Sequence, residues 1–378
     1  MNTALRVGLI GAGYMGRAHA IAFHGVGATF GPRYAVECVA LADHSLQSAA
    51  IAAQMLGFGR GVADWRELIE DPTLDLIDIC APNYLHRDMA LAALHAGKHV
   101  YCEKPLANDV SGAAEVARAA RASGKQCAMG FNYICNPLLQ WARELIASGE
   151  LGDIVSFNGR YLEDYMSDPR APFTWRCERR LAGAGALADL GSHLINLAHF
   201  LLGPIERVAA VLETVHRERV PPVESRPRAV ENEDSAHVLI ELASGVRGVM
   251  QISRVATGYK CGLAVRVQGT RGSIAFDQER MNELRLYQAD DPQGRRGFRT
   301  LLTGPDHPDY AAFCPAPGHG LGVNDLKVIE VRNVVRAVRE QQPVWPDFAE
   351  GLRVQQVMAA IEASHASGAW TRVQQETR

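Results

Sequence analysis

A glycine-rich turn after the first apolar run constrains the fold more than any other feature of the chain. Leu5–Ile10 has the composition of a buried strand, and a helical pattern follows the turn Gly11-Ala12-Gly13-Tyr14-Met15-Gly16. This order of strand, glycine turn and helix is typical of the first βαβ unit of a dinucleotide-binding domain. Gly11 permits the tight turn, Gly13 lets the backbone approach a pyrophosphate, and Gly16 allows close helix–strand packing. We therefore expect the six turn residues to bind a dinucleotide at the helix N-terminus, where anions are stabilised.

The first 130 residues continue this alternation of apolar runs and helical patterns. Such alternation predicts a parallel, doubly wound α/β sheet, so residues 1–130 are expected to form a Rossmann domain. Further strands are expected at Val36–Ala42, Leu74–Ala81, Val100–Cys102 and Gln126–Gly130, with helices at Tyr14–Val26, Ser45–Leu56, Arg87–Ala96 and Ala113–Ser123.

The pattern changes after Asn136, and residues 131–378 are expected to form an α+β domain with a large, mostly antiparallel open sheet. Residues 216–233 contain three prolines and many charges and are expected to be an exposed excursion, and residues 290–322 a long loop. We expect helices at Leu138–Ala147, Ala186–Leu202, Asp325–Arg339 and Leu352–Ser364, a strand at Ile154–Tyr161, and strands over Val208–Leu286 with a hairpin turn at Ser244-Gly245.

The overall composition excludes several classes of protein. A formal net charge of −3 gives no general attraction for nucleic acid or acidic membranes, and no apolar run reaches the roughly 20 residues of a membrane span. The eight cysteines form no C-x-x-C pair, and the chain starts with a strand pattern and not with a signal peptide. His95 and His99 have helical metal spacing but no acidic third ligand. We expect a cytoplasmic protein without a metal and without nucleic-acid or membrane partners.

An acidic residue at the end of the second strand indicates which dinucleotide is bound. Asp43 is placed to accept hydrogen bonds from a ribose diol, and its charge would repel a 2′-phosphate, so NAD is favoured over NADP. The alternative is a helix N-cap, a role that Ser45 could fill instead. The connection from Gly16 to Asp43 exceeds the usual ~20 residues, and an insertion around Gly25–Arg33 would absorb the difference.

Two further strand ends carry candidate cofactor residues. Pro82, Asn83 and His86 follow the strand Leu74–Ala81, and Asn83 is placed either to contact the nicotinamide ribose or to cap the next helix. Glu103-Lys104-Pro105 follows Val100–Cys102. Because ligands of open parallel sheets bind beyond the carboxyl ends of the strands, Lys104 is expected to point its ammonium at the bound molecules. Its alternative role is that of a surface lysine.

A second group of candidates lies on the predicted helix Ala186–Leu202. Asp189 and His193 are four residues apart, so an α-helix would place them on one face, with Asp189 orienting the imidazole as a base. Asn196 lies along the same stripe. Because glycine has no side chain, the start of the helix is expected to leave room for a substrate at Gly183, Gly185 and Gly191. The alternative is an ordinary contact on a helix surface.

This combination of motifs resembles the family of glucose–fructose oxidoreductase, inositol dehydrogenase and MocA proteins over essentially the whole chain. The resemblance implies that Lys104, Asp189 and His193 act on a sugar or cyclitol hydroxyl, with a cis bond between Lys104 and Pro105. Many members have Asp where this chain has Asn196, so the resemblance leaves the substrate open. The matching residues are the glycine turn, Glu103-Lys104-Pro105 and Gly183–His193, and the segments Gly294–Arg299, Gly304–Pro308 and Thr174-Trp175-Arg176 resemble the branch that contains levoglucosan dehydrogenase.

The resemblance also suggests substrate and subunit contacts. Tyr133, Trp175 and Arg176 could line a sugar site together with Lys104, Asp189, His193 and Asn196, although aromatic residues are as often part of a core. Related proteins use the sheet face of the second domain for dimers and tetramers, which implies a homo-oligomer.

Taken together, the sequence predicts an NAD-dependent dehydrogenase that acts on a secondary hydroxyl of a sugar, anhydrosugar or cyclitol. His193 would take the hydroxyl proton, with Asp189 and Lys104 as its partners. Two alternatives are an NAD-dependent glycoside hydrolase that oxidises the sugar transiently and a non-catalytic sugar or nucleotide sensor on the same fold.

Overall fold

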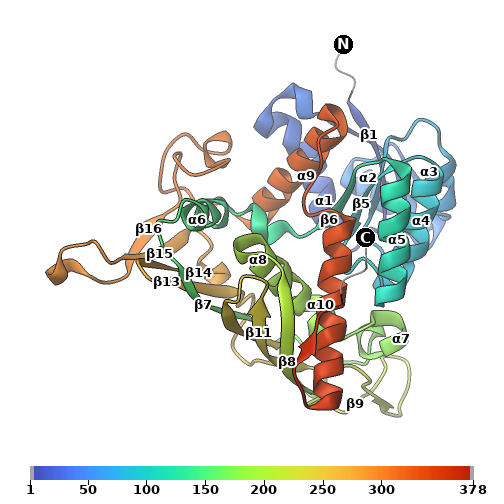
Figure 1. Cartoon of the computed structure of the whole chain (residues 1–378). Coiled ribbons are helices and arrows are strands. Elements are labelled where there is room, and N and C mark those ends of the chain that lie inside the picture. Colours follow the sequence, from blue (N-terminus) through green and yellow to red (C-terminus); the bar gives the residue numbers. More distant parts are fainter. Residues whose placement is uncertain (1–3, 375–378) are drawn as a thin grey trace. The chain divides into compact units, whose positions relative to one another are not determined.

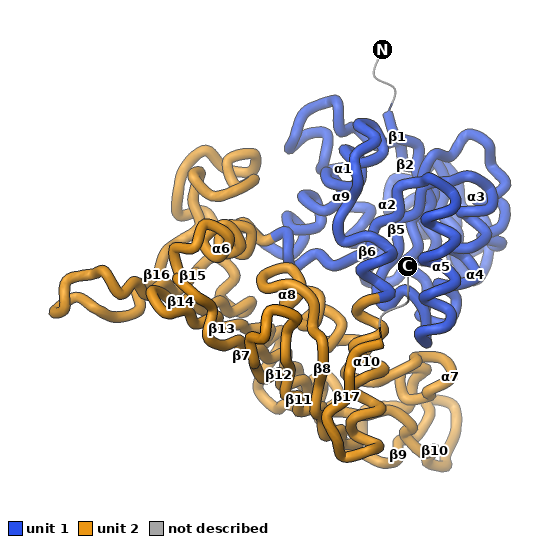
Figure 2. Tube along the Cα trace, viewed as in Figure 1, with its two compact units in different colours: residues 1–135, 322–352 blue, residues 136–321, 353–378 orange. Residues whose placement is uncertain are grey.

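The computed structural model describes residues 4–374, which form two compact units (Figure 2). Among these residues, unit 1 comprises 4–135 and Gly322–Leu352, and unit 2 comprises Asn136–Leu321 and 353–374. The sequence predicts that all of residues 131–378 belong to the second domain, whereas Gly322–Leu352 packs in unit 1. Among residues 4–374, no helix has both the length and the apolar character needed to cross a bilayer.

Unit 1 is built on a parallel sheet of six strands in the order β3-β2-β1-β4-β5-β6. Strands β1, β5 and β6 of this sheet are labelled in Figure 1. This is the predicted doubly wound sheet, and its inner strands are nearly continuous apolar runs because both of their faces are buried. The sequence analysis missed β3, which has only three residues and too few side chains to show a period. The strands are β1 (Leu5–Ile10), β2 (Val36–Ala42), β3 (Arg60–Val62), β4 (Leu76–Ile79), β5 (His99–Glu103) and β6 (Cys127–Gly130).

Helix α2 of unit 1 begins and ends at residues with clear capping roles. The Ser45 hydroxyl accepts from the Ser48 amide at the start of α2, and the left-handed Gly57 ends that helix. Far along the chain, α9 returns to pack against α1. The helices are α1 (Tyr14–Phe30), α2 (Leu46–Leu56), α3 (Arg66–Glu70), α4 (Asn83–His95), α5 (Val110–Ser123) and α9 (Val323–Glu340).

Unit 2 contains a sheet of nine strands in the order β16-β15-β14-β13-β7-β12-β11-β8-β17. Every neighbouring pair is antiparallel except β7 and β12, which confirms the predicted mostly antiparallel sheet. The predicted hairpin turn at Ser244-Gly245 joins β11 to β12. The strands are β7 (Ile154–Leu162), β8 (Ile205–Glu213), β11 (Ser235–Leu242), β12 (Arg247–Ser253), β13 (Ala264–Gly269), β14 (Gly272–Asp277), β15 (Glu283–Gln288), β16 (Arg299–Leu302) and β17 (Thr371–Arg372).

One face of this sheet is covered by helix α8, and the opposite face carries exposed side chains. A Cβ on Gly159 of β7 would lie 2.7 Å from a methyl group of Leu194, so this glycine lets α8 pack close to the sheet. On the other face Val211, Leu239 and Val249 are exposed. The helices of unit 2 are α6 (Pro137–Ala147), α7 (Arg179–Ala182), α8 (Ser192–Leu202) and, from Arg353 onward, α10 (Phe348–Ser367).

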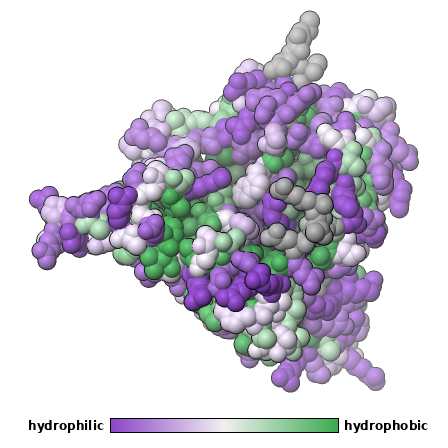
Figure 3. Space-filling view, viewed as in Figure 1, coloured by the Kyte–Doolittle hydropathy of each residue, from purple (hydrophilic) through white to green (hydrophobic). Residues whose placement is uncertain are grey.

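Three sequence expectations for unit 2 are wrong in part. The predicted loop 290–322 contains β16. This strand shows no alternation of apolar and polar residues in the sequence, because both of its faces are largely exposed. The loop before it, residues 292–298, is exposed and carries mainly hydrophilic side chains (Figure 3). The predicted exposed excursion 216–233 includes the small strand pair β9 (Glu218–Arg219) and β10 (Arg228–Ala229), and Arg219, Asn232 and Glu233 are buried. Finally, Leu187–Gly191 is a π-helical turn and not part of an α-helix.

Candidate active site

The three glycines of the first turn are required for three different reasons. Gly11 has a φ of +96°, and a Cβ there would lie 2.7 Å from the Cys80 carbonyl oxygen. A Cβ on Gly16 would lie 2.0 Å from the Gly11 oxygen, so this position accepts no side chain without a backbone shift. Around Gly13, by contrast, a Cβ meets no atom within 4 Å. The space beside Gly13 is therefore open to a ligand.

The helix that starts at this turn leaves its N-terminal amides available. Gly13 is the N-cap of α1 and has no side chain to accept a hydrogen bond, and the first turn contains no acidic residue. Tyr14 is 80% exposed, while Ala12 and Met15 are partly buried. An uncapped helix N-terminus beside an open glycine fits a pyrophosphate, because the amides and the helix dipole both stabilise an anion.

Asp43 follows directly after β2 and is ionised. Partial burial opposes the charge, but hydrogen bonds from the His44 amide (2.7 Å) and the His44 ring (2.9 Å) lower the pKa of the carboxyl group below its usual value. The capping alternative is wrong, since Ser45 caps α2. The long connection before Asp43 is explained by the extension of α1 to Phe30, which absorbs part of the expected insertion.

The next strand end contains a buried histidine that bridges two loops. His86 is 1% exposed, and its ring nitrogens lie 2.7 Å from the carbonyl oxygens of Ala81 and Pro105. Burial lowers the pKa of this histidine. Pro82 occupies the N-cap position of α4, so Asn83 is the first helical residue and not the cap.

Lys104 follows the last residue of β5, and the bond between Lys104 and Pro105 is cis, as the resemblance implied. The side chain of Glu103 points into unit 1: its Oε1 accepts from Lys327 Nζ (2.8 Å) and His19 Nε2 (3.0 Å), and its Oε2 accepts from the Lys104 amide (3.2 Å). Burial opposes the charge of Glu103, but Lys327 and His19 outweigh it and hold the pKa well below its usual value.

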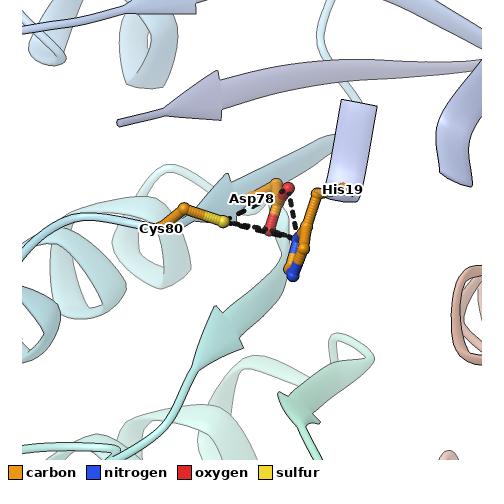
Figure 4. Close-up of side chains that lie close together, drawn as sticks. All are labelled: His19, Asp78 and Cys80. Carbon is orange, nitrogen blue, oxygen red and sulfur yellow. Dashed lines mark hydrogen bonds and ion pairs between the residues drawn. The ribbon is translucent and has the colours of Figure 1, made fainter. Parts of the chain in front are cut away.

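His19, Asp78 and Cys80 lie close together inside unit 1 (Figure 4). Their atoms are types that bind zinc, but both nitrogens of His19 already contact carboxylates, at 2.9 Å to Asp78 and 3.0 Å to Glu103. Burial and the Lys327 charge lower the pKa of His19, yet the two carboxylates raise it above its ordinary value. We therefore interpret the cluster as a hydrogen-bonded imidazolium between two carboxylates.

In unit 2, the π-turn places the second group of candidates. Asp189 lies within the turn and accepts a hydrogen bond from the Tyr165 hydroxyl at 2.7 Å. His193 is largely buried in the first turn of α8 and meets the Tyr161 ring edge-on, with centroids 6.1 Å apart. The backbone from Asp189 toward His193 begins in a π-turn where an α-helix was expected, and a π-turn closes its hydrogen bonds from residue i to i+5. Such turns occur frequently at functional sites.

Two of the three glycines that were expected to leave room for a substrate, Gly185 and Gly191, lie against other parts of unit 2. A Cβ on Gly185 would lie 2.0 Å from the Glu233 carbonyl oxygen, and Gly191 packs against Ile252. The buried Glu233 carboxylate accepts from the amides of Gly185 (2.8 Å) and Leu187 (2.9 Å), which fixes the start of the π-turn. Burial raises the pKa of Glu233.

The remaining candidates divide between the two units. In unit 2, Asn196 is buried in α8, Trp175 is partly buried, and the exposed Arg176 stacks on Trp175 with 4.5 Å between the guanidinium carbon and the ring centroid. Tyr133 is partly buried after β6 in unit 1. Unit 1 thus collects its candidates at the carboxyl ends of parallel strands, where open α/β sheets bind ligands.

The sequence analysis did not predict the buried network of charged side chains around Glu103. Asp78 gave a usable signal, because an acid inside the apolar run Leu76–Ile79 predicts a buried partner. Lys327 and Glu330 gave no such signal, because they contact β5 from positions more than 200 residues further along the chain.

Comparisons with known proteins agree with this geometry. Residues 5–131 match the oxidoreductase family with an NAD-binding Rossmann fold, and residues 139–275 match the GFO/IDH/MocA C-terminal domain. Levoglucosan dehydrogenase from Pseudarthrobacter phenanthrenivorans is 37% identical over 386 residues, which cover 98% of each chain.

Solved structures extend the similarity to the whole fold. Levoglucosan dehydrogenase in complex with NADH and L-sorbose has a TM-score of 0.97 at 38% identity, covering 99% of this chain and 100% of that chain. An NAD-binding oxidoreductase from Klebsiella pneumoniae has a TM-score of 0.95 at 42% identity, with the same coverage. The predicted α/β fold with a Rossmann domain and the predicted cofactor NAD are confirmed.

Proposed function

Because the chain belongs to the Gfo/Idh/MocA oxidoreductase family, we propose that it is an NAD-dependent dehydrogenase for a secondary hydroxyl of a sugar, anhydrosugar or cyclitol. One observation carries the substrate class: the match to levoglucosan dehydrogenase extends over 98% of both chains. It therefore includes unit 2, which carries Asp189, His193 and Asn196, and not only the cofactor domain that many dehydrogenases share.

We assign the acid–base chemistry to three side chains. His193 accepts the proton of the substrate hydroxyl, and the Asp189 carboxylate stabilises the imidazolium that results. The Lys104 ammonium donates a hydrogen bond to the same oxygen and stabilises the negative charge that develops there. NAD, when bound, supplies the acceptor for the hydride that leaves the carbon. The Tyr165 hydroxyl that donates to Asp189 supports the assignment, because it keeps this carboxylate oriented.

The cofactor contacts follow the strand ends of unit 1. The amides of the turn Gly11–Gly16 would hold the pyrophosphate, and Asp43 would accept from the adenosine ribose diol, which favours NAD over NADP. Pro82 and Asn83 would flank the nicotinamide ribose. We propose that the buried His86 and Glu103 act through the backbone they hold, and that Lys104 alone among them presents its side chain to the ligands.

The substrate contacts combine flat apolar surfaces with hydrogen-bond donors. Trp175 and Tyr133 would pack against the apolar face of a sugar ring, and Arg176 would donate to its hydroxyl groups. Asn196 offers an amide where many family members have a carboxylate, and we propose that it contributes to the choice of substrate.

The experiment replaces Lys104 and His193 separately by alanine and measures NAD reduction at 340 nm with a panel of inositols, hexoses and anhydrosugars. Each variant should lose at least about 100-fold in turnover, within the range that general acid–base catalysis contributes, and should still bind NADH in a fluorescence titration. Lys125→Ala and His237→Ala are the matched controls in units 1 and 2. Near-wild-type turnover of either Lys104→Ala or His193→Ala contradicts the mechanism.

We further propose that the protein is a cytoplasmic homo-oligomer, a dimer or tetramer. All eight cysteines are free thiols, as in a reducing compartment. The uncovered face of the nine-stranded sheet carries Val211, Leu239 and Val249, which are 61%, 49% and 42% exposed. A second copy of the chain would bury them. Light scattering should show a dimer or tetramer that Leu239→Glu converts to a monomer, and a monomeric wild type contradicts the proposal.

A further inference from the structure

We propose that Glu103 is a positioning residue for Lys104, and that two buried cations from distant parts of the chain, His19 and Lys327, hold it in place. The inference rests on the proposed role of Lys104. It concerns the carboxylate beside this lysine, whose partners all lie inside unit 1.

The contacts of the Glu103 carboxylate connect it directly to the backbone of the next residue. One oxygen accepts from His19 (3.0 Å) and Lys327 (2.8 Å), and the other accepts from the Lys104 amide (3.2 Å). Because Glu103 ends β5, the Lys104 amide is no longer part of the strand ladder. The Glu103 carboxylate therefore accepts the hydrogen bond of the Lys104 amide in place of a neighbouring strand. A rotation of the Glu103 side chain would shift the backbone nitrogen of Lys104.

Both cations are themselves fixed by further buried partners. His19 contacts Asp78 at 2.9 Å, and its ring stacks on Tyr101 with centroids 4.6 Å apart. Lys327 contacts Glu330 at 2.7 Å. The side chains of His19, Asp78 and Lys327 are fully buried, and those of Glu103 and Glu330 are 6% and 5% exposed. A core needs no such network for stability, since apolar residues of similar volume stabilise as well or better. A role in fixing geometry explains why these costly groups are present.

The neighbouring strand is shaped around the same carboxylate. A Cβ on Gly130, the last residue of β6, would lie 2.6 Å from Glu103 Oε1 and 2.8 Å from its carboxyl carbon. Gly130 has no positive φ that would require glycine. The position therefore needs glycine because the Glu103 carboxylate lies against its backbone.

Lys104 is also held on its other side. The His86 ring contacts the Pro105 carbonyl oxygen at 2.7 Å, so the residues before and after Lys104 are both bound by buried side chains. This arrangement suits a lysine whose side chain must always point in the same direction. A misplacement of about 1 Å can cost about 100-fold in rate.

The test uses two variants that disturb Glu103 in different ways. Glu103→Gln removes the charge and keeps the shape, whereas Gly130→Ala removes no charge and displaces the carboxylate. Each variant is measured alone and combined with Lys104→Ala. We expect kcat to fall roughly 10- to 100-fold for each single variant, with NADH affinity from fluorescence titration unchanged within about twofold. In the Lys104→Ala background neither change should lower kcat further, because nothing remains to be positioned.

A buried lysine at the opposite end of the same strand provides the control. Lys98 is 7% exposed and donates to the carbonyl oxygens of Asp71 (2.6 Å) and Leu74 (2.8 Å) before β5 begins. Lys98→Met should lower the melting temperature and leave kcat unchanged. An equal fall in kcat in both the wild-type and the Lys104→Ala backgrounds means that Glu103 supports only the fold, and this result overturns the proposal.

Failure of the positioning role of Glu103 can be distinguished from failure of the proposed function. If Lys104→Ala keeps wild-type turnover, the proposed mechanism fails. Positioning is then judged from crystal structures of the wild type and Glu103→Gln. A displacement of the Lys104 ammonium by about 1 Å or more supports the positioning role, and an unchanged lysine overturns it.

Discussion

Replacing either Gly13 or Gly16 by alanine adds the same methyl group to the same turn, yet the structure predicts opposite consequences. At Gly16 the new Cβ would lie 2.0 Å from the Gly11 carbonyl oxygen, and because that oxygen belongs to the backbone, only a backbone shift can relieve the contact. At Gly13 the Cβ meets nothing within 4 Å, and the φ of −68° is one that alanine adopts freely. Gly16→Ala should therefore damage the fold, and Gly13→Ala should damage cofactor binding.

The magnitudes follow from these distances. Overpacking at Gly16 costs about 1–3 kcal/mol, which corresponds to a fall in melting temperature of about 2–12 °C for a domain of this size. Gly13→Ala loses at most about 1 kcal/mol, as expected for alanine at an N-cap. Its methyl group occupies the space of the pyrophosphate. Losing one charge-assisted hydrogen bond, about 1.5–3 kcal/mol, weakens NADH binding roughly 10- to 150-fold.

Two assays without turnover separate the two effects. Thermal unfolding of the cofactor-free protein measures stability, and NADH fluorescence titration measures affinity. Gly297→Ala is the control, because this exposed glycine has no atom within 4 Å of its Cβ position and no positive φ. The reasoning is refuted if Gly13→Ala binds NADH as tightly as the wild type, or if it lowers the melting temperature as much as Gly16→Ala does.

Three further predictions concern hydrogen-bonded polar groups. Tyr165→Phe removes the hydrogen bond to Asp189 and should cost about 0.5–1.5 kcal/mol in urea unfolding, whereas no loss would show that this bond contributes nothing. Glu233→Ala leaves two buried amides without their acceptor and should cost about 2–6 kcal/mol, clearly more than Glu233→Gln; equal losses would contradict this role. The raised pKa of His19 means that its stabilising contribution is fully present below its unfolded pKa of about 6.5 and is lost as the pH rises through the folded value. His19→Gln should therefore flatten the fall in unfolding free energy as the pH rises above about 6.5, and an unchanged slope would contradict the assignment.

Local rules were enough to predict most of unit 1. The expected bounds of Leu5–Ile10 and Val36–Ala42 are those of β1 and β2, because apolar runs bounded by glycine or charge are readable without tertiary information. The roles of Gly11 and Gly16 were also predictable, since the fingerprint encodes backbone geometry.

The errors have a common physical origin in contacts between distant segments. The π-turn at Leu187–Gly191 is fixed at its start by Glu233, more than 40 residues away. The spacing of apolar residues in the sequence does not predict such a turn. Gly185 was expected to make room for a substrate, whereas it makes room for the Glu233 backbone. The partners of Glu103 were missed for the same reason, because Lys327 returns from the far end of the chain.

The stoichiometry of free NADH tests the central claim most directly. The protein is incubated with excess NAD and an oxidisable sugar or cyclitol from the panel, and NADH released into solution is compared with the substrate consumed. A dehydrogenase in which His193 takes the proton and NAD leaves reduced predicts one free NADH for each substrate oxidised. Consumption of substrate without net NADH, as in glycoside cleavage with transient oxidation, would contradict the account.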